Sequence, residues 1–233
     1  MAEEQQDDVI YDYGRRYQFT LKGVYPLLMH KDDIGSADAL IAWRTDSANK
    51  DVSVKGDDRS PAWTWQTYLY HDGEVVAMPQ ENIMAAIRTA GAQINLKGTT
   101  TFKAKTQSGL FIDGEFCEFT TGGRQVRMDD ILKFKNAKFS EHVQRSRELG
   151  FDLHVKRARP SGASGSKHIR VRPIFKDWQI RGVIEVGDPA ITDDILKELF
   201  DKAGRYAGLC DWRPSSKKSP GPYGTFTSTV IRV

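Results

Sequence analysis

A dense run of cations around a small hinge is the feature of this chain with the clearest chemical meaning. Residues Val155–Arg181 hold eight lysines and arginines, with Asp177 as the only acid. So many like charges repel one another unless an anionic partner neutralises them, and a polyphosphate backbone is the usual partner. The hinge Ser161–Ser166 has no side chain large enough to pack, so we expect it to be mobile without that partner. The alternative is a solvated β-hairpin whose charges serve solubility. The expected nucleic-acid contacts here are Lys156, Arg157, Arg159, Lys167, Arg170 and Arg172.

A second basic segment, rich in glycine, follows a predicted helix near the end of the chain. The glycines of Ala203–Pro214 allow positive φ and a close approach of the backbone to a ligand. Its arginines can fork onto phosphate oxygens, and its aromatic rings can stack on bases or brace the turn. The alternative is an ordinary helix end with a packed tryptophan and a surface Asp211–Arg213 pair. The expected contacts in and after this segment are Arg205, Gly208, Trp212, Arg213, Lys217 and Lys218.

Two adjacent carboxylates, Asp32 and Asp33, follow the first predicted strand and suggest a hypothesis of catalysis. Paired carboxylates can hold a divalent metal and position a water molecule. The alternative is a helix N-cap or a solvated loop. The chain has no nucleophile-elbow, zinc-protease, Walker or dinucleotide-binding motif. We therefore expect a protein without enzyme activity, metal or cofactor, and we keep cleavage at this acidic pair as the less favoured hypothesis.

Charge is divided unevenly along the chain. Residues 1–58 carry 12 acidic and seven basic side chains, which gives a formal charge of −5. Since the whole chain has a formal charge of +3, residues 59–233 carry +8. This asymmetry predicts a cationic face for a ligand and an acidic face for a neighbour. The two cysteines, Cys117 and Cys210, have no metal-type spacing and favour a reducing compartment. With no apolar run of membrane-spanning length and an acidic, disordered start over residues 1–12, we expect a cytoplasmic protein.

Periodicity predicts an alternation of strands and helices. Apolar residues recur every second position in the predicted strands and every third or fourth in the predicted helices. The sequence Asp113–Gly114 between short apolar runs is typical of a hairpin turn. Strands are predicted at Arg16–Val24, Ala62–Tyr70, Trp178–Val186 and Gly224–Val233, and helices at Pro79–Ala90 and Thr192–Tyr206, the latter capped by Thr192.

Without two insertions, this order becomes βαββαβ. The insertions cover residues of about 31–61, which we expect to form a flexible loop after the first strand, and about 121–169, which include the basic hairpin. The expected fold is therefore α+β, a single ferredoxin-like (RRM-like) domain over residues 13–233.

Three blocks of the chain resemble the RAMP-superfamily subunits that form the backbone of CRISPR effector complexes, and the relatives of these subunits in phages and prophages. The first block is YQFTLKGVYPLLMH followed by VVAMPQENIMAAIRTAG, the second is HIRVRPIFKDW, and the third is AGRYAGLCDWRP followed by GTFTSTVIRV. The last block resembles the glycine-rich loop of the family, and Cys210 stands where that pattern leads us to expect glycine.

The resemblance implies a protein that coats one nucleic-acid strand as a repeating filament, with the basic hairpin as a thumb that kinks the strand. We expect non-catalytic, largely sequence-independent binding of a single strand, either guide RNA or single-stranded DNA. Further copies of the chain and other effector-complex subunits are the expected protein partners. The alternatives are a phage single-stranded-DNA-binding or annealing protein, and a structural assembly protein. A third is metal-dependent RNA cleavage at Asp32 and Asp33, because some RAMP subunits cleave RNA with an acid in this loop.

Overall fold

The computed structural model describes residues 14–158 and 168–233. The predicted disorder at residues 1–12 and the hinge Ser161–Ser166 lie outside these residues, as do Arg159 and Lys167. The described chain combines helices with three antiparallel sheets, so the expected α+β class is confirmed.

The largest sheet brings the two ends of the chain together. It has six strands, ordered β11-β1-β10-β7-β3, and β6 also pairs with β10. Every pair is antiparallel, and β1 lies between β10 and β11. The strands are β1 (Arg15–Gly23), β3 (Ala77–Pro79), β6 (Leu110–Ile112), β7 (Phe116–Thr121), β10 (Trp178–Val186) and β11 (Phe226–Arg232). The predictions of strands at the positions of β1, β10 and β11 are confirmed.

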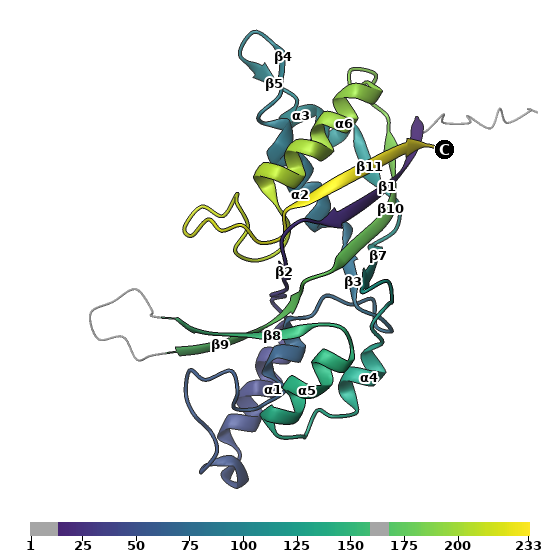
Figure 1. Cartoon of the computed structure of the whole chain (residues 1–233). Helices are drawn as coiled ribbons and strands as arrows, with labels where there is room; N and C mark the ends of the chain where they lie inside the picture. The colour runs from purple at the N-terminus through teal and green to yellow at the C-terminus, as the bar shows by residue number, and fades with distance from the viewer. Residues whose placement is uncertain (1–13, 159–167) are drawn as a thin grey trace, which may run out of the picture.

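Two helices cover one face of this sheet (Figure 1). They are α2 (Gln80–Gly91) and α6 (Asp193–Lys202), and α6 continues into the π-helical turn η3 (Ala203–Ala207). On β1, Tyr17, Phe19 and Leu21 are buried on the helix-covered face, with the ring centroid of Phe19 lying 5.3 Å from that of Phe200 on α6. The hydroxyl of Thr192 accepts a hydrogen bond from the Ile195 amide and caps α6 as expected. Both predicted helices are therefore confirmed.

A three-stranded sheet carries the basic hairpin away from the main sheet (Figure 1). It consists of β2 (Leu27–Leu28), β9 (His168–Phe175) and β8 (Asp152–Ala158), in that order. After a bend at Lys176–Asp177, the chain passes from β9 into β10. The hairpin and the main sheet are thus joined by almost continuous strand, which fixes where the base of the hairpin lies.

Two expectations for residues 31–70 are wrong. The segment predicted as a flexible loop contains α1 (Ile34–Thr45) and the short turn η1 (Ser47–Asn49), and the segment predicted as a strand is the 3-10 helix η2 (Thr64–Tyr68). The hydroxyls of Thr64 and Thr67 each donate to a carbonyl three residues earlier. Such local bonds close helical turns, and they outweigh the alternation of aromatic residues that indicated a strand.

The prediction of a hairpin at Asp113–Gly114 is also wrong. The flanking strands β6 and β7 do not pair with each other; both pair with β10, one after the other along the same edge. Gly114, with a φ of 75°, lies in the turn between them. The turn therefore interrupts the strand edge that pairs with β10 and does not reverse the chain.

The remaining elements lie at the two ends of the molecule. Near the hairpin, α4 (Met128–Leu132) and α5 (Phe139–Glu148) pack around η2, where the Trp65 indole donates to Nδ1 of His142 over 3.0 Å. At the opposite end, β4 (Asn95–Lys97), β5 (Thr100–Thr101) and α3 (Lys103–Ser108) form a small projection (Figure 1).

Candidate nucleic-acid interface

A groove of about 290 Å³ brings together the two basic segments singled out in the sequence. One wall is the hairpin and the other is the loop that follows η3. The lining residues are Lys156, Arg157, Arg170 and Arg172 from the hairpin, and Asp211, Trp212, Ser216 and Ser219 from the loop. Five of the twelve predicted contact residues therefore line one groove, although Arg172 of the hairpin and Asp211 of the loop are 39 positions apart in the chain.

The strand register of the hairpin places cations opposite one another. Lys156 on β8 pairs with Arg170 on β9, and Arg157 pairs with Ile169. Like charges directly across a strand pair are destabilising. The structure offsets this repulsion with two aspartates and one tryptophan, none of which belongs to the hairpin.

The first aspartate is Asp58, which comes from the segment after α1. Its carboxylate is 2% exposed and lies 3.1 Å from Nη1 of Arg170. It also accepts hydrogen bonds from the Val171 amide (3.1 Å) and the Tyr68 hydroxyl (3.3 Å). Burial and the charge of Asp58 together raise the pKa of Tyr68 to about 12. Arg170 is thus anchored at one end while 40% of its side chain stays exposed.

The second aspartate is Asp211, which links the loop to the hairpin. Its Oδ2 lies 3.0 Å from Nε of Arg172 and 3.6 Å from Nδ1 of His30. The nearby His30 imidazole and the charge of Arg172 hold the pKa of Asp211 below its usual value. The carboxylate therefore stays ionised and ties Arg172 to the wall of the groove.

The tryptophan is Trp212, whose ring contacts both a cation and a second aromatic ring. Nζ of Lys156 is 3.5 Å from the Trp212 ring centroid, and the Tyr223 ring stacks on Trp212 with centroids 5.4 Å apart. A cation held this way over indole is attracted by the ring quadrupole. The roles expected for this ring were stacking on bases and bracing the turn, and its contact with Tyr223 shows the bracing. The ring also orients Lys156, which the sequence did not predict.

The backbone beneath this tryptophan is left-handed at two residues other than glycine. Cys210 has a φ of 60° and Trp212 a φ of 54°. Residues other than glycine rarely adopt such φ values, and those that do cluster at functional sites. The family pattern suggested glycine at position 210, and its positive φ is the conformation that glycine accepts most readily.

The groove keeps an excess of positive charge after its internal pairs are counted. Its four cations face Asp211 on the lining and Asp58 beneath it, which leaves a formal charge of +2. Within residues 14–158 and 168–233, no carboxylate forms an ion pair with Lys156 or Arg157, and both side chains are exposed. Lys156 lies over the Trp212 ring, and neither cation is neutralised by a carboxylate of the described residues.

Two predicted residues, Gly208 and Arg213, lie beside the groove rather than in it. They line a neighbouring cavity of about 60 Å³ against Asn82 and Thr89 of α2. Arg213 donates to the Cys210 carbonyl (2.6 Å) and to the Ser215 hydroxyl (3.1 Å). The alternative Asp211–Arg213 surface pair is therefore wrong, because each residue has another partner.

The other predicted contacts are more scattered. Arg205 on η3 pairs with Asp201 over 3.1 Å and does not line the groove. Lys217 and Lys218 are exposed in the loop between the lining residues Ser216 and Ser219. Arg159 and Lys167 lie beyond the described residues of the hairpin.

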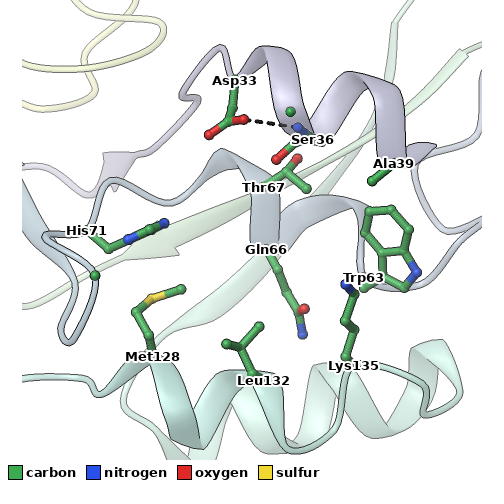
Figure 2. A pocket seen from close by; sticks show the side chains of 12 residues that line it. Asp33, Ser36, Ala39, Trp63, Gln66, Thr67, His71, Met128, Leu132 and Lys135 are labelled. Atoms are coloured by element: carbon green, nitrogen blue, oxygen red, sulfur yellow. Dashed lines mark hydrogen bonds between the residues drawn. The ribbon is translucent and has the colours of Figure 1, made fainter. Parts of the chain in front are cut away.

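One member of the acidic pair, Asp33, has a structural role in this fold, and its neighbour Asp32 is exposed. Asp33 is the N-cap of α1, and its Oδ1 accepts from the Ser36 amide over 2.9 Å (Figure 2). Its Oδ2 lies 2.9 Å from Nζ of Lys31. These bonds lower the pKa of Asp33 to about 2. Figure 2 shows Asp33 above a hollow of about 320 Å³ into which His71 and Leu132 point. Among the described residues, no group of three or more His, Cys, Asp or Glu could hold a metal ion.

Sequence reasoning missed the residues that hold the groove in place: Asp58, Tyr68, His30 and Tyr223. Asp58 lies 112 positions from Arg170, and no local pattern connects the two. Asp211, which also holds the groove in place, lies in the glycine-rich segment Ala203–Pro214 that the sequence had already singled out.

No protein-family model matches this chain, and no curated protein has a matching sequence. In the part of the chain that the structure describes, no helix is both long and apolar enough to cross a lipid bilayer.

Proposed function

We propose that this protein binds a single strand of nucleic acid, without cleaving it, in the groove between the β8–β9 hairpin and the loop after η3. The observation that carries the proposal is the meeting of four cations from the hairpin with the loop in one groove. Two of these cations, Lys156 and Arg157, have no carboxylate partner among the described residues. Charges of this kind contact phosphates, so binding is largely independent of base sequence.

The strand order supports a ferredoxin-like core for this proposal. If β1, β7, β10 and β11 are the four core strands, their order in the sheet is fourth, first, third, second. The helix α2 precedes β7 and α6 precedes β11, as the βαββαβ arrangement requires. The outer face of β1 carries Gln18, Lys22 and Arg16 and no aromatic ring, which favours the groove over the open sheet as the binding surface.

The resemblance to RAMP subunits extends the proposal to assembly. A repeating filament of copies along one strand fits a site that grips phosphates without reading bases. Guide RNA and single-stranded DNA both present this backbone. Competition between RNA and DNA of equal length separates the guide-RNA holder from the phage-type DNA-binding protein.

The test is a titration of a fluorescently labelled 30-nucleotide single strand, read by anisotropy at about 50 mM salt. Reversing charge with Lys156→Glu and Arg157→Glu together should weaken binding by about tenfold or more, because two phosphate contacts become repulsive. The matched control is Lys97→Glu with Lys103→Glu, which makes the same change of charge on exposed residues of β4 and α3 in the projection far from the groove. Equal loss in both double variants, or no loss in the first, contradicts the groove assignment.

A further inference from the structure

The two edges of the main sheet are built differently. At one edge, β3 has three residues, ends at Pro79 and passes straight into α2. A short strand with a proline is a common way to prevent a sheet from pairing with another chain. At the other edge, β11 has seven residues, and its stretch Phe226–Ile231 carries no charge and no proline. One edge is protected and the other is not.

The hydrogen bonds of β11 show which of its backbone groups point outward. The Val233 amide donates to the Arg16 carbonyl over 3.0 Å, and the Val24 amide donates to the Thr225 carbonyl over 2.9 Å. In an antiparallel pair, residues that bond to the neighbouring strand alternate with residues whose N–H and C=O point away from it. The second set here consists of Phe226, Ser228, Val230 and Arg232. Among the described residues, no backbone hydrogen bond joins this outward side to another segment.

The beginning of β11 is covered, which limits how a new strand can add. Gly204 of η3 lies so close to the Phe226 carbonyl that a Cβ on Gly204 would be 2.1 Å from that oxygen. An added strand therefore has only the part of the edge from Ser228 onward.

A second copy of the same strand fits this limited edge. With a twofold axis at Val230, that residue lies opposite its own counterpart, and Ser228 lies opposite Arg232 of the second copy. The three uncovered outward residues then form hydrogen-bonded pairs, with about six backbone hydrogen bonds in total. The two Arg232 side chains lie at opposite ends, and each η3 turn lies beyond the end of the other strand. On the open face, Thr229 meets the exposed Ile231 of the second copy.

We propose that β11 pairs with β11 of a second copy about a twofold axis at Val230 and joins the two main sheets into one. A twofold contact closes after two copies, so it cannot itself generate a filament. It is a surface separate from the groove, and it forms without nucleic acid.

The register is tested by mixing two single variants, Thr229→Cys and Ile231→Cys, in nuclease-treated protein under mild oxidation. Both side chains are exposed, whereas the natural cysteines Cys117 and Cys210 are buried. The two introduced thiols face each other across the proposed contact. We expect a covalent dimer from the mixture and none from either variant alone. No dimer in the mixture, or equal dimer in a single variant, overturns the proposed register.

A second pair of variants tests the contact without cross-linking. Ser228→Pro removes an outward N–H and leaves every bond to β1 in place, whereas Ser228→Val keeps the N–H. Light scattering at tens of micromolar should give twice the 26.3 kDa chain mass for the unaltered protein and Ser228→Val, and a single mass for folded Ser228→Pro. A monomer for the unaltered protein, or a dimer for Ser228→Pro, contradicts the contact. Strand binding in the groove should be the same for both variants, which separates this test from that of the proposed function.

Discussion

Arg170 of the basic hairpin is held by Asp58, a carboxylate 112 positions earlier in the chain, over 3.1 Å. The carboxylate is almost fully buried, while much of the arginine remains exposed. The segment after the first helix therefore supports the hairpin from beneath, and its acid fixes the position of a cation that lines the groove.

Replacement of this acid should loosen the base of the hairpin. Asp58→Asn keeps the size of the side chain but leaves the Val171 amide and Arg170 without a charged acceptor. We expect the free energy of unfolding to fall by about 1–3 kcal/mol, measured by urea denaturation. Asp129→Asn, which removes a carboxylate that is 76% exposed, is the matched control and should change stability little. Equal stability of the two variants would show that Asp58 does not anchor the hairpin.

The salt dependence of strand binding should reveal which arginines touch phosphates. Arg157 lines the groove and has no carboxylate partner among the described residues, whereas Arg205 pairs with Asp201 on another surface. For Arg157→Ala we expect the slope of log K against log salt to fall by about 0.7, the contribution of one contact to a single strand. Arg205→Ala should leave the slope unchanged. The measurement is anisotropy at four salt concentrations, and an unchanged slope for Arg157→Ala removes that residue from the interface.

Acid should destabilise the fold through His142. Burial lowers the pKa of this imidazole below 6.5, and its Nδ1 accepts the Trp65 indole N–H, so the folded protein holds the ring neutral. Below pH 6.5 the unfolded chain binds the proton first, and the free energy of unfolding falls with pH until the folded-state pKa is reached. The same direction applies to His71 and His154, whose pKa values burial also lowers.

Urea denaturation at pH 7.5, 6.5 and 5.5 checks this dependence. We expect stability to decrease across the series, and we expect His142→Phe, which cannot take up a proton, to lose less stability between pH 7.5 and 5.5 than the unaltered protein. Identical pH dependence in the two proteins would exclude His142 as a source of acid sensitivity.

Close packing at η3 should make one glycine irreplaceable. A Cβ on Gly204 would lie 2.1 Å from the Phe226 carbonyl oxygen, so Gly204→Ala has to push β11 and the π-helical turn apart. We expect a loss of about 1–3 kcal/mol in the free energy of unfolding. Gly187→Ala is the control, because a Cβ there meets no atom within 4 Å. Similar thermal midpoints for the two variants would show that η3 can move without cost.

Local sequence patterns were sufficient to predict the helices and strands that bury one face and expose the other. The alternation on β1, the capped amphipathic helix α6 and the basic strands β8 and β9 could all be predicted, because each pattern reflects the burial of one face of one element. The same reasoning failed for η2, where threonine hydroxyls close helical turns within an alternating aromatic sequence. It failed again at Asp113–Gly114, because a turn signal does not state which strand the next residues will pair with.

The sequence alone established that cations concentrate in two segments and that these segments flank the second half of an α+β core. It could not establish that Lys156 lies over Trp212, that Asp211 holds Arg172, or that Asp58 lies beneath Arg170. Each of these contacts joins residues far apart in the chain. Such contacts form only when the whole fold closes the intervening loops, and no local spacing records them.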